Sequence, residues 1–267
     1  MSADPSSDGD YATILYREEG PLAYITLNRP GNGNMFNKQM LLELRSVLER
    51  NRSESRTRVV ILTGAGERFF CIGGEKDGLE KTLLYPGALP VIDVYEAIER
   101  HPKPIIASVN GFAVGGGNVL HVVCDLTIAK ESAIFRQVGP SMGSYDAGYG
   151  TWCLEDLVGR KRAKEIWFSN EKMTAQHARE IGLINRVVSD DQLVEATHAW
   201  AMEIAKRGSH ALNAIKASFT ARTGGVAGMS RITQDLLMPY YLRTEESKEL
   251  GESFRERRDP DPDKFGN

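Results

Sequence analysis

The chain has 267 residues, of which 41% are hydrophobic and 26% charged, and a formal net charge of -3. This length predicts one large domain with an appendage, and the composition is typical of a soluble globular protein. The slight excess of acid argues against a general nucleic-acid binder. No apolar run approaches the roughly 20 residues that a membrane span needs. We therefore expect neither nucleic acid nor a membrane among its partners.

The N-terminus and the cysteines indicate where the protein works. Residues 1–10 are polar and acidic, without the basic start and apolar core of a signal peptide, and they predict a disordered lead-in. The three cysteines are an odd number without metal-ligand spacing. They indicate reduced thiols, a cytoplasmic protein and no metal site.

Hydrophobic periodicity predicts strands that alternate with helices at first and give way to helices later. Tyr11–Arg17 and Leu22–Leu27 alternate apolar and polar residues around a Glu-Glu-Gly-Pro turn and predict a hairpin. The further elements expected, in chain order, are a helix at Asn37–Asn51, a strand at Arg58–Leu62, a helix at Ile92–Arg100, strands at Pro104–Val109 and Cys124–Ala129, and helices at Lys161–Phe168, Ala175–Ile181, Asp190–Lys206, Ala211–Thr220, Gly228–Leu242 and Glu245–Arg257. This order predicts an α/β core with a helical C-terminal appendage.

Two segments share a pattern that goes beyond the alternation of elements. VVILTGAGERFFCIGGE at residues 59–75 and PIIASVNGFAVGGGNVL at 104–120 both run from an apolar strand, through a Gly-rich bend, to a double or triple glycine. Neither contains GxGxxG or a Gly-Lys-Ser/Thr phosphate loop. Repeated strand–turn–helix units would also produce this pattern. Together, however, the segments resemble two backbone hairpins facing one ligand, with the amides of Gly74 and Gly116 as an oxyanion hole for a carbonyl that becomes an enolate.

Four motifs carry a resemblance to a known family. NRPGNGNMFN at Asn28–Asn37, LTGAGERFFCIGGE at Leu62–Glu75, PKPIIASVNGFAVGGGNVL at Pro102–Leu120 and CDLTIA at Cys124–Ala129 together resemble the crotonase (enoyl-CoA hydratase/isomerase) superfamily. The resemblance implies a spiral of ββα turns at residues 11–206 and a C-terminal helical region at 207–267 that builds a homotrimer or a homohexamer. It also implies an acyl-CoA substrate, held through its thioester oxygen by Gly74 and Gly116, and no tightly bound cofactor.

Two positions argue against the commonest reaction of that superfamily. Its hydratases place one glutamate two residues after the triple glycine and another two residues after the glutamine of an FGQ motif. This sequence has Val119 and Gly139 there, so ordinary enoyl-CoA hydration is not expected. Gly139 is interpreted as space for an anion or water. Glu75 replaces the usual aspartate after the double glycine, and Arg136 replaces the glycine of FGQ, pointing either toward an anion pocket or to solvent.

The following stretch narrows the resemblance. QVGPSMGSYDAGYG at Gln137–Gly150 and GRKRAKEIWF at Gly159–Phe168 resemble the subgroup of 1,4-dihydroxy-2-naphthoyl-CoA synthase and 2-ketocyclohexanecarboxyl-CoA hydrolase. These enzymes make or break a C–C bond next to a CoA thioester. By position, the resemblance implies catalytic roles for Ser144, Asp146 and Tyr85, a pocket for water or a bicarbonate base at Gln137, Gly139 and Trp167, and CoA contacts at Arg29, Ile72, Lys76 and Arg257.

These residues predict an acyl-CoA hydrolase that opens a cyclic β-keto ring by retro-Claisen cleavage through a thioester enolate. Taken alone, Asp146 also fits the N-cap of a helix, and Ser144 a turn residue. Two alternatives for the whole protein stay open. One is a ring-closing lyase of the naphthoyl-CoA synthase type, and the other is a non-catalytic CoA-ester-binding or scaffold member.

Overall fold

The computed structural model of the chain describes residues 11–75, 90–145 and 148–265. The expected lead-in at 1–10 and three candidate site residues, Lys76, Tyr85 and Asp146, lie outside the described residues. By its internal contacts the chain divides into two units, Met1–Ser209 and His210–Asn267.

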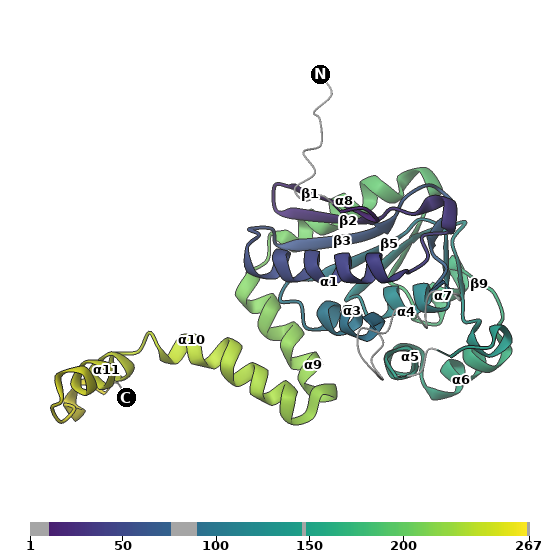
Figure 1. Cartoon of the computed structure of the whole chain (residues 1–267). Helices are drawn as coiled ribbons and strands as arrows, with labels where there is room; N and C mark the ends of the chain where they lie inside the picture. Colours follow the sequence, from purple (N-terminus) through teal and green to yellow (C-terminus); the bar gives the residue numbers. More distant parts are fainter. Residues whose placement is uncertain (1–10, 76–89, 146–147, 266–267) are drawn as a thin grey trace, which may run out of the picture. The chain divides into compact units, whose positions relative to one another are not determined.

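A six-stranded sheet forms the centre of the first unit, in the order β1-β2-β3-β5-β7-β10 (Figure 1). Its strands are β1 (Ile14–Glu19), β2 (Leu22–Leu27), β3 (Val59–Gly64), β5 (Ile105–Val109), β7 (Leu126–Lys130) and β10 (Arg186–Val188). The expected hairpin is confirmed, because β1 and β2 pair in antiparallel fashion, whereas every later pair in this sheet is parallel. The α/β class expected from the sequence is therefore confirmed.

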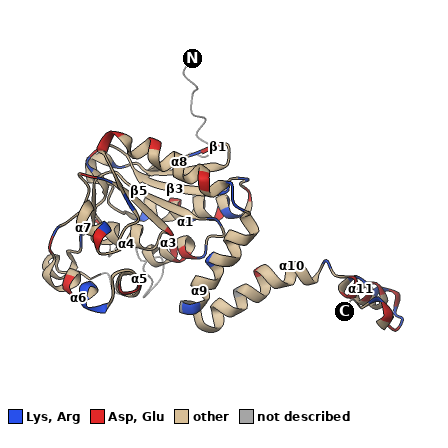
Figure 2. Ribbon diagram, turned by 180° about the vertical axis from the view of Figure 1, so that it is seen from behind, with Lys and Arg blue, Asp and Glu red and all other residues tan. Residues whose placement is uncertain are grey.

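Helices cover both faces of this sheet. The helices of the first unit are α1 (Lys38–Ser53), α3 (Pro90–Glu99), α4 (Gly116–Val122), α5 (Tyr149–Val158), α6 (Arg160–Ser169), α7 (Ala175–Glu180) and α8 (Leu193–Ala205). One face packs against α8 and the other against α1 and α3 (Figure 1). Along β3, Val59 and Ile61 join the α8 side, and Val60 and Leu62 join the α1 side. Neither β3 nor β5 contains a charged residue, as parallel strands buried on both faces require (Figure 2).

A second, four-stranded sheet was not expected from the sequence. Its order is β4-β6-β8-β9, with β4 at Phe69–Cys71, β6 at Phe112–Val114, β8 at Ile134–Arg136 and β9 at Met173–Thr174. The first three pair in parallel, and β9 is antiparallel to β8. None of these strands exceeds three residues, so none is long enough to show a clear period of two. This sheet receives the chain after β3, β5 and β7, and it therefore sets where the Gly-rich turns lie.

The second unit is helical and is described by itself. It contains most of α9 (Ser209–Arg231), the π-helical turn η5 (Ile232–Leu237), α10 (Met238–Tyr241) and α11 (Glu245–Glu256). Gly225, with φ of 52° and ψ of -131°, interrupts α9 between the two helices expected there. After α11 the chain folds back onto Glu249, whose side chain is 2% exposed and accepts hydrogen bonds from Lys264 Nζ at 2.9 Å and from the Asp261 amide at 3.0 Å. None of the described helices is both long and apolar enough to cross a membrane.

Glu43 of α1 fixes the chain as it enters β1. Its side chain is 6% exposed and accepts hydrogen bonds from the amide of Ala12 at 2.8 Å, the amide of Thr13 at 2.9 Å and the hydroxyl of Thr13 at 2.6 Å. Gln39 donates a further bond at 2.7 Å. Burial raises the pKa of Glu43, but these hydrogen bonds together outweigh burial and hold it below its ordinary value.

Glu43→Gln is expected to lower the free energy of unfolding at pH 7 by about 1.5–3 kcal/mol, because an amide replaces the charged acceptor of several buried donors. Since the pKa is lower in the folded state, the contribution of the carboxylate is present above its ordinary pKa of 4.5 and is lost as the pH falls through the folded value. Urea unfolding should therefore show that the difference in free energy of unfolding between wild type and variant becomes smaller below about pH 4.

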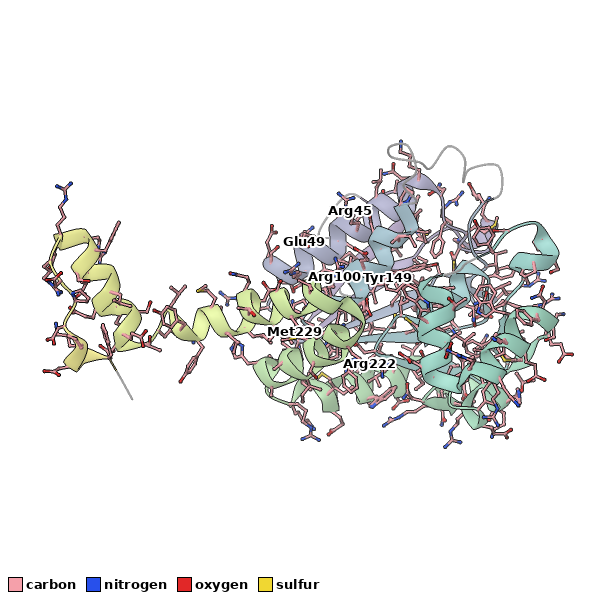
Figure 3. The ribbon with its side chains drawn as sticks, turned by 90° about the horizontal axis from the view of Figure 1, so that it is seen from below. Arg45, Glu49, Arg100, Tyr149, Arg222 and Met229 are labelled. Carbon is pink, nitrogen blue, oxygen red and sulfur yellow. The ribbon has the colours of Figure 1, made fainter. Side chains whose placement is uncertain are left out.

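Glu49 is the matched control for this experiment. It lies on the exposed side of the same helix (Figure 3), with 67% of its side chain accessible. Glu49→Gln should change stability little at any pH, because exposed ion pairs contribute at most about 1 kcal/mol. A Glu43→Gln effect that is small, or equal at pH 7 and pH 3, would contradict the role assigned to Glu43.

Candidate functional site

The two Gly-rich segments meet beside the small sheet. β4 and β6 are parallel neighbours, so the turns that follow them leave the sheet at the same edge. A Cβ built on Gly73 would lie 3.2 Å from the amide nitrogen of Gly116, and one built on Gly117 would lie 2.0 Å from the carbonyl oxygen of Cys71. A side chain at position 117 would therefore collide with the main chain. Glycine allows the two turns to lie side by side.

The amides of Gly74 and Gly116 have no hydrogen-bond acceptor among the described residues. Gly116 begins α4, and Gly74 forms an isolated parallel bridge with Phe36. In this bridge the Phe36 amide donates to the Gly73 carbonyl at 2.8 Å, and the Glu75 amide donates to the Phe36 carbonyl at 3.0 Å. Within the part of the chain that the structure describes, neither the Gly74 nor the Gly116 amide donates to another protein group. Two adjacent N–H groups of this kind suit an oxygen that acquires negative charge.

Arg29 lies on the Gly74 side of these turns, and its guanidinium is engaged within the fold. Its Nη2 is 2.5 Å from Glu75 Oε1, and its Nη1 donates to the Met35 carbonyl at 2.8 Å. The two paired side chains are 17% and 28% exposed. Two of its three guanidinium nitrogens are thus bound to protein groups. The contact between Arg29 and CoA that the resemblance implied stays a prediction.

Tyr95 of α3 supports the Gly116 side and was not singled out in the sequence. Its hydroxyl donates to the Gly116 carbonyl at 3.1 Å, and its ring packs against that of Tyr149, labelled in Figure 3, at 6.1 Å between centroids. Burial raises the pKa of Tyr149, and the negative charges of Glu99 and Glu96 raise it further, so the phenol stays protonated. No pattern in the sequence distinguishes either tyrosine from a core aromatic residue.

Neither position of the two hydratase glutamates carries a carboxylate in this chain. Val119 is 1% exposed, and a Cβ on Gly150 would lie 2.9 Å from its Cγ2. A Cβ on Gly139 would lie 2.9 Å from both the Ser144 carbonyl oxygen and the Tyr145 Cα. A side chain at position 139 would therefore meet the chain's own backbone. The interpretation of Gly139 as space for an anion or water stays a prediction.

The three residues of the expected anion pocket have different partners. Gln137 is 1% exposed, and its Oε1 has no hydrogen-bond partner among the described residues. Trp167 is 7% exposed and donates its Nε1–H to the Gly150 carbonyl at 3.2 Å. The unpaired Gln137 atom is an acceptor, which suits the O–H of water or of bicarbonate. The pocket for water or a bicarbonate base at Gln137, Gly139 and Trp167 stays a prediction.

Arg136 has a structural partner that neither expectation anticipated. Its Nε donates to the carbonyl of Asn170 at 2.6 Å. Asn170 ends α6 in the left-handed conformation, accepts a bond from the Ser141 amide at 3.2 Å and donates to the Trp167 carbonyl at 2.7 Å. Arg136, which is half-buried, thus ties β8 to the end of α6 through its Nε, a contact that the sequence did not predict.

The remaining candidates are placed as follows. Ser144 is exposed and lines an open hollow of about 440 Å³ with Pro140, Gly143 and Tyr145. Its expected partner Asp146 lies outside the described residues, as do Tyr85 and Lys76. The amide of Ile72 donates to the Gly33 carbonyl at 3.2 Å, which anchors the first glycine turn. Arg257 is exposed and ends α11 with a φ of 54°, in the second unit.

Other titratable groups near the turns are kept neutral. Burial lowers the pKa of His121 to about 3, and its Nε2 lies 3.0 Å from Asn118 Oδ1. Burial raises the pKa of Cys71 to about 12 and that of Cys153 to about 11, which suppresses the thiolate. In the described ranges no group of three or more His, Cys, Asp and Glu residues could hold a metal ion.

Comparison with known proteins shows which family shares this sequence and fold. A family model described as enoyl-CoA hydratase/isomerase matches residues 17–264. An enoyl-CoA hydratase from Bacillus anthracis is 30% identical, with a TM-score of 0.74 over 94% of this chain and 98% of that one. DspI from Pseudomonas aeruginosa is 26% identical, with a TM-score of 0.74 over 96% and 98%. A probable enoyl-CoA hydratase/isomerase from Mycobacterium abscessus is 26% identical, with a TM-score of 0.73 over 94% and 98%. The chain therefore belongs to the enoyl-CoA hydratase/isomerase family of the crotonase superfamily, whose members are generally enzymes that act on CoA esters.

Proposed function

We propose that this protein is an acyl-CoA hydrolase that opens the ring of a cyclic β-keto acyl-CoA by retro-Claisen cleavage. The observation that supports this proposal is the combination of two amides without a hydrogen-bond partner among the described residues, at Gly74 and Gly116, with Val119 and Gly139 in place of the hydratase glutamates. The amides suit a thioester enolate. With Val119 and Gly139, the chain lacks the two carboxylates that deliver water across a double bond in the hydratases that it resembles.

The proposed reaction begins with water and the ring ketone. Asp146, two residues after Ser144, takes a proton from the water as its oxygen adds to the ketone carbon. Ser144, exposed in the hollow after β8, orients the ketone. The bond between the ketone carbon and the α-carbon of the thioester then breaks. Its electron pair becomes the enolate, and the former ketone carbon becomes a carboxylic acid.

The enolate is the species that the glycine turns would stabilise. Its negative charge develops on the thioester oxygen, within reach of the Gly74 and Gly116 amides, and each such donor typically contributes about 10²–10³ in rate. Protonated Asp146 returns its proton to the α-carbon. The product is an open-chain acyl-CoA with a terminal carboxyl group, so atoms and charge balance with the addition of one water.

Ring closure of the naphthoyl-CoA synthase type is the second candidate, since it uses the same enolate. Gln137 is the observation that favours it, because its buried Oε1 lacks a partner among the described residues and could accept from the O–H of bicarbonate. The Nε1–H of Trp167, which would donate to the anion, is bonded to the Gly150 carbonyl. We therefore assign bicarbonate no step in the leading mechanism.

Mass spectrometry of the purified protein with 2-ketocyclohexanecarboxyl-CoA and related β-keto thioesters tests the leading proposal. At least one thioester is expected to gain the mass of water, with crotonyl-CoA left unchanged. Hydration of crotonyl-CoA with no ring-opened product would show that the reaction is that of the named hydratase neighbours. Binding of CoA esters without turnover of any thioester would favour the non-catalytic alternative.

Asp146→Asn is expected to lower kcat for ring opening by about 10²–10⁴, because the amide can neither accept nor return the proton. The Kd for the substrate should change little, since no binding role is assigned to Asp146. Ser144→Ala should lower kcat less, since the serine orients the ketone and transfers no proton. Stopped-flow kinetics and substrate titration of the inactive variant separate the two constants. An unchanged kcat in Asp146→Asn would remove Asp146 from the mechanism.

Bicarbonate dependence separates the two ring reactions. Ring opening is expected to proceed at the same rate in carbon-dioxide-free buffer and in buffer with added bicarbonate, because no step uses that anion. Ring closure with succinylbenzoyl-CoA that rises with bicarbonate, and falls in Gln137→Ala, would instead support the second candidate.

A further inference from the structure

The residue that follows Gly74 is Glu75, and its carboxylate is held by a rigid partner. Arg29 Nη2 lies 2.5 Å from Glu75 Oε1, while Nη1 of the same guanidinium donates to the Met35 carbonyl. A planar guanidinium that is fixed at one nitrogen presents the other in a defined direction. The position of the Glu75 side chain is therefore set by the segment before α1.

That segment is itself anchored to the main sheet and the small one. The Arg29 amide donates to Asn34 Oδ1 at 2.9 Å. Asn34 is fully buried, and its Nδ2 donates to the carbonyls of Ala65 at 3.1 Å and Phe69 at 2.9 Å. Ala65 is the first residue after β3, and Phe69 is the first residue of β4. Arg29 is thus tied to the two strands that lead into the first glycine turn.

Gly74 lies between two kinds of restraint. Before it, Gly73 is packed against Gly116, which sets the distance between the turns. After it, the bridge to Phe36 and the Arg29–Glu75 ion pair hold the chain. A peptide amide turns when either of its flanks moves. The direction of the Gly74 N–H therefore depends on the ion pair as well as on the glycine contact.

Charge gives the pair a second effect. A carboxylate one residue from Gly74 would oppose negative charge on a bound thioester oxygen, and this repulsion is strong where water is excluded. Arg29 balances that charge. The ion pair is partly buried, with side chains 17% and 28% exposed, so solvent screens it less than a surface pair.

The geometry points to Arg29 and Glu75 as a pair of positioning residues that orient the Gly74 amide toward the thioester oxygen. This inference rests on the oxyanion role proposed for Gly74 and not on the ring-opening reaction. It is an alternative to the CoA contact implied for Arg29, because a guanidinium engaged with Glu75 and Met35 would act on the carbonyl site rather than on phosphate.

Two non-reacting ligands test the inference directly. Butyryl-CoA carries a thioester carbonyl, whereas S-butyl-CoA has a methylene group in its place, and neither contains a ring to open. Isothermal titration calorimetry of the full chain gives the ratio of the Kd of S-butyl-CoA to the Kd of butyryl-CoA. This ratio measures what binding of the carbonyl oxygen contributes to affinity. The wild type is expected to bind butyryl-CoA more tightly. Because butyryl-CoA undergoes no ring opening, the outcome is independent of the reaction proposed above.

Glu75→Gln and Arg29→Met are each expected to reduce that ratio by up to about tenfold, the contribution of one well-aligned hydrogen bond to an equilibrium constant. The Kd of S-butyl-CoA should stay unchanged. The double variant should lose no more than the single variants, because the pair acts as one unit. Arg29→Lys, which keeps the charge but not the planar fork, should fall between wild type and Arg29→Met.

Infrared spectroscopy of bound carbonyl-¹³C butyryl-CoA supplies a signature that a purely structural role would not change. The carbonyl stretch should shift to lower frequency on binding to wild type, and less in Glu75→Gln. Arg45→Met is the control, because it breaks the exposed pair of Arg45 with Asp93, 2.9 Å apart, between α1 and α3 (Figure 3). It should leave both the ratio and the stretch unchanged.

Several results would overturn the inference. Equal weakening of both ligands in Arg29→Met would show a phosphate contact instead. Additive losses in the double variant would show that the two residues act separately. An unchanged ratio in Glu75→Gln, or no preference for the thioester in wild type, would remove the positioning role. Thermal unfolding of each variant confirms that the folded protein is being compared.

Discussion

A Cβ at Gly117 would lie 2.0 Å from the carbonyl oxygen of Cys71, a separation that no side chain tolerates. This close approach lets the turn after β6 lie against the turn after β4, and it brings the amides of Gly74 and Gly116 to one side of the small sheet. The main sheet, with helices on both faces, supplies the rigidity that keeps the two turns in place. The site is thus made of backbone, and the surrounding side chains adjust it.

Those adjustments differ on the two sides of the site. On the Gly116 side, a hydrogen bond from Tyr95 holds the carbonyl of the glycine itself. On the Gly74 side, the neighbouring residue Glu75 is held by Arg29. The first contact is neutral and buried, whereas the second is a partly buried ion pair. Ionic strength and substitution should therefore affect the Gly74 side more than the Gly116 side.

The sequence predicted the long elements well and the local contacts poorly. The helix expected at Asn37–Asn51 is α1, because five apolar residues repeat at helical spacing and Asn37 caps it through a bond to the Met40 amide. β4, β6 and β8 were missed, since three residues do not establish an alternation. The glycine turns were found because glycine itself is the signal. The contacts of Arg29 with Glu75 and of Arg136 with Asn170 were not, because these partners lie 46 and 34 residues away, and only the tertiary fold brings them together.

The backbone beside Gly139 sets what a hydratase-like acid at this position would require. The Cβ of a glutamate at position 139 would lie 2.9 Å from both the Ser144 carbonyl oxygen and the Tyr145 Cα. The segment 139–145 would have to move to admit it, and the contact of Ser141 with Asn170 would have to adjust as well. Conversion of this protein into a hydratase therefore calls for redesign of the whole loop rather than for a single substitution.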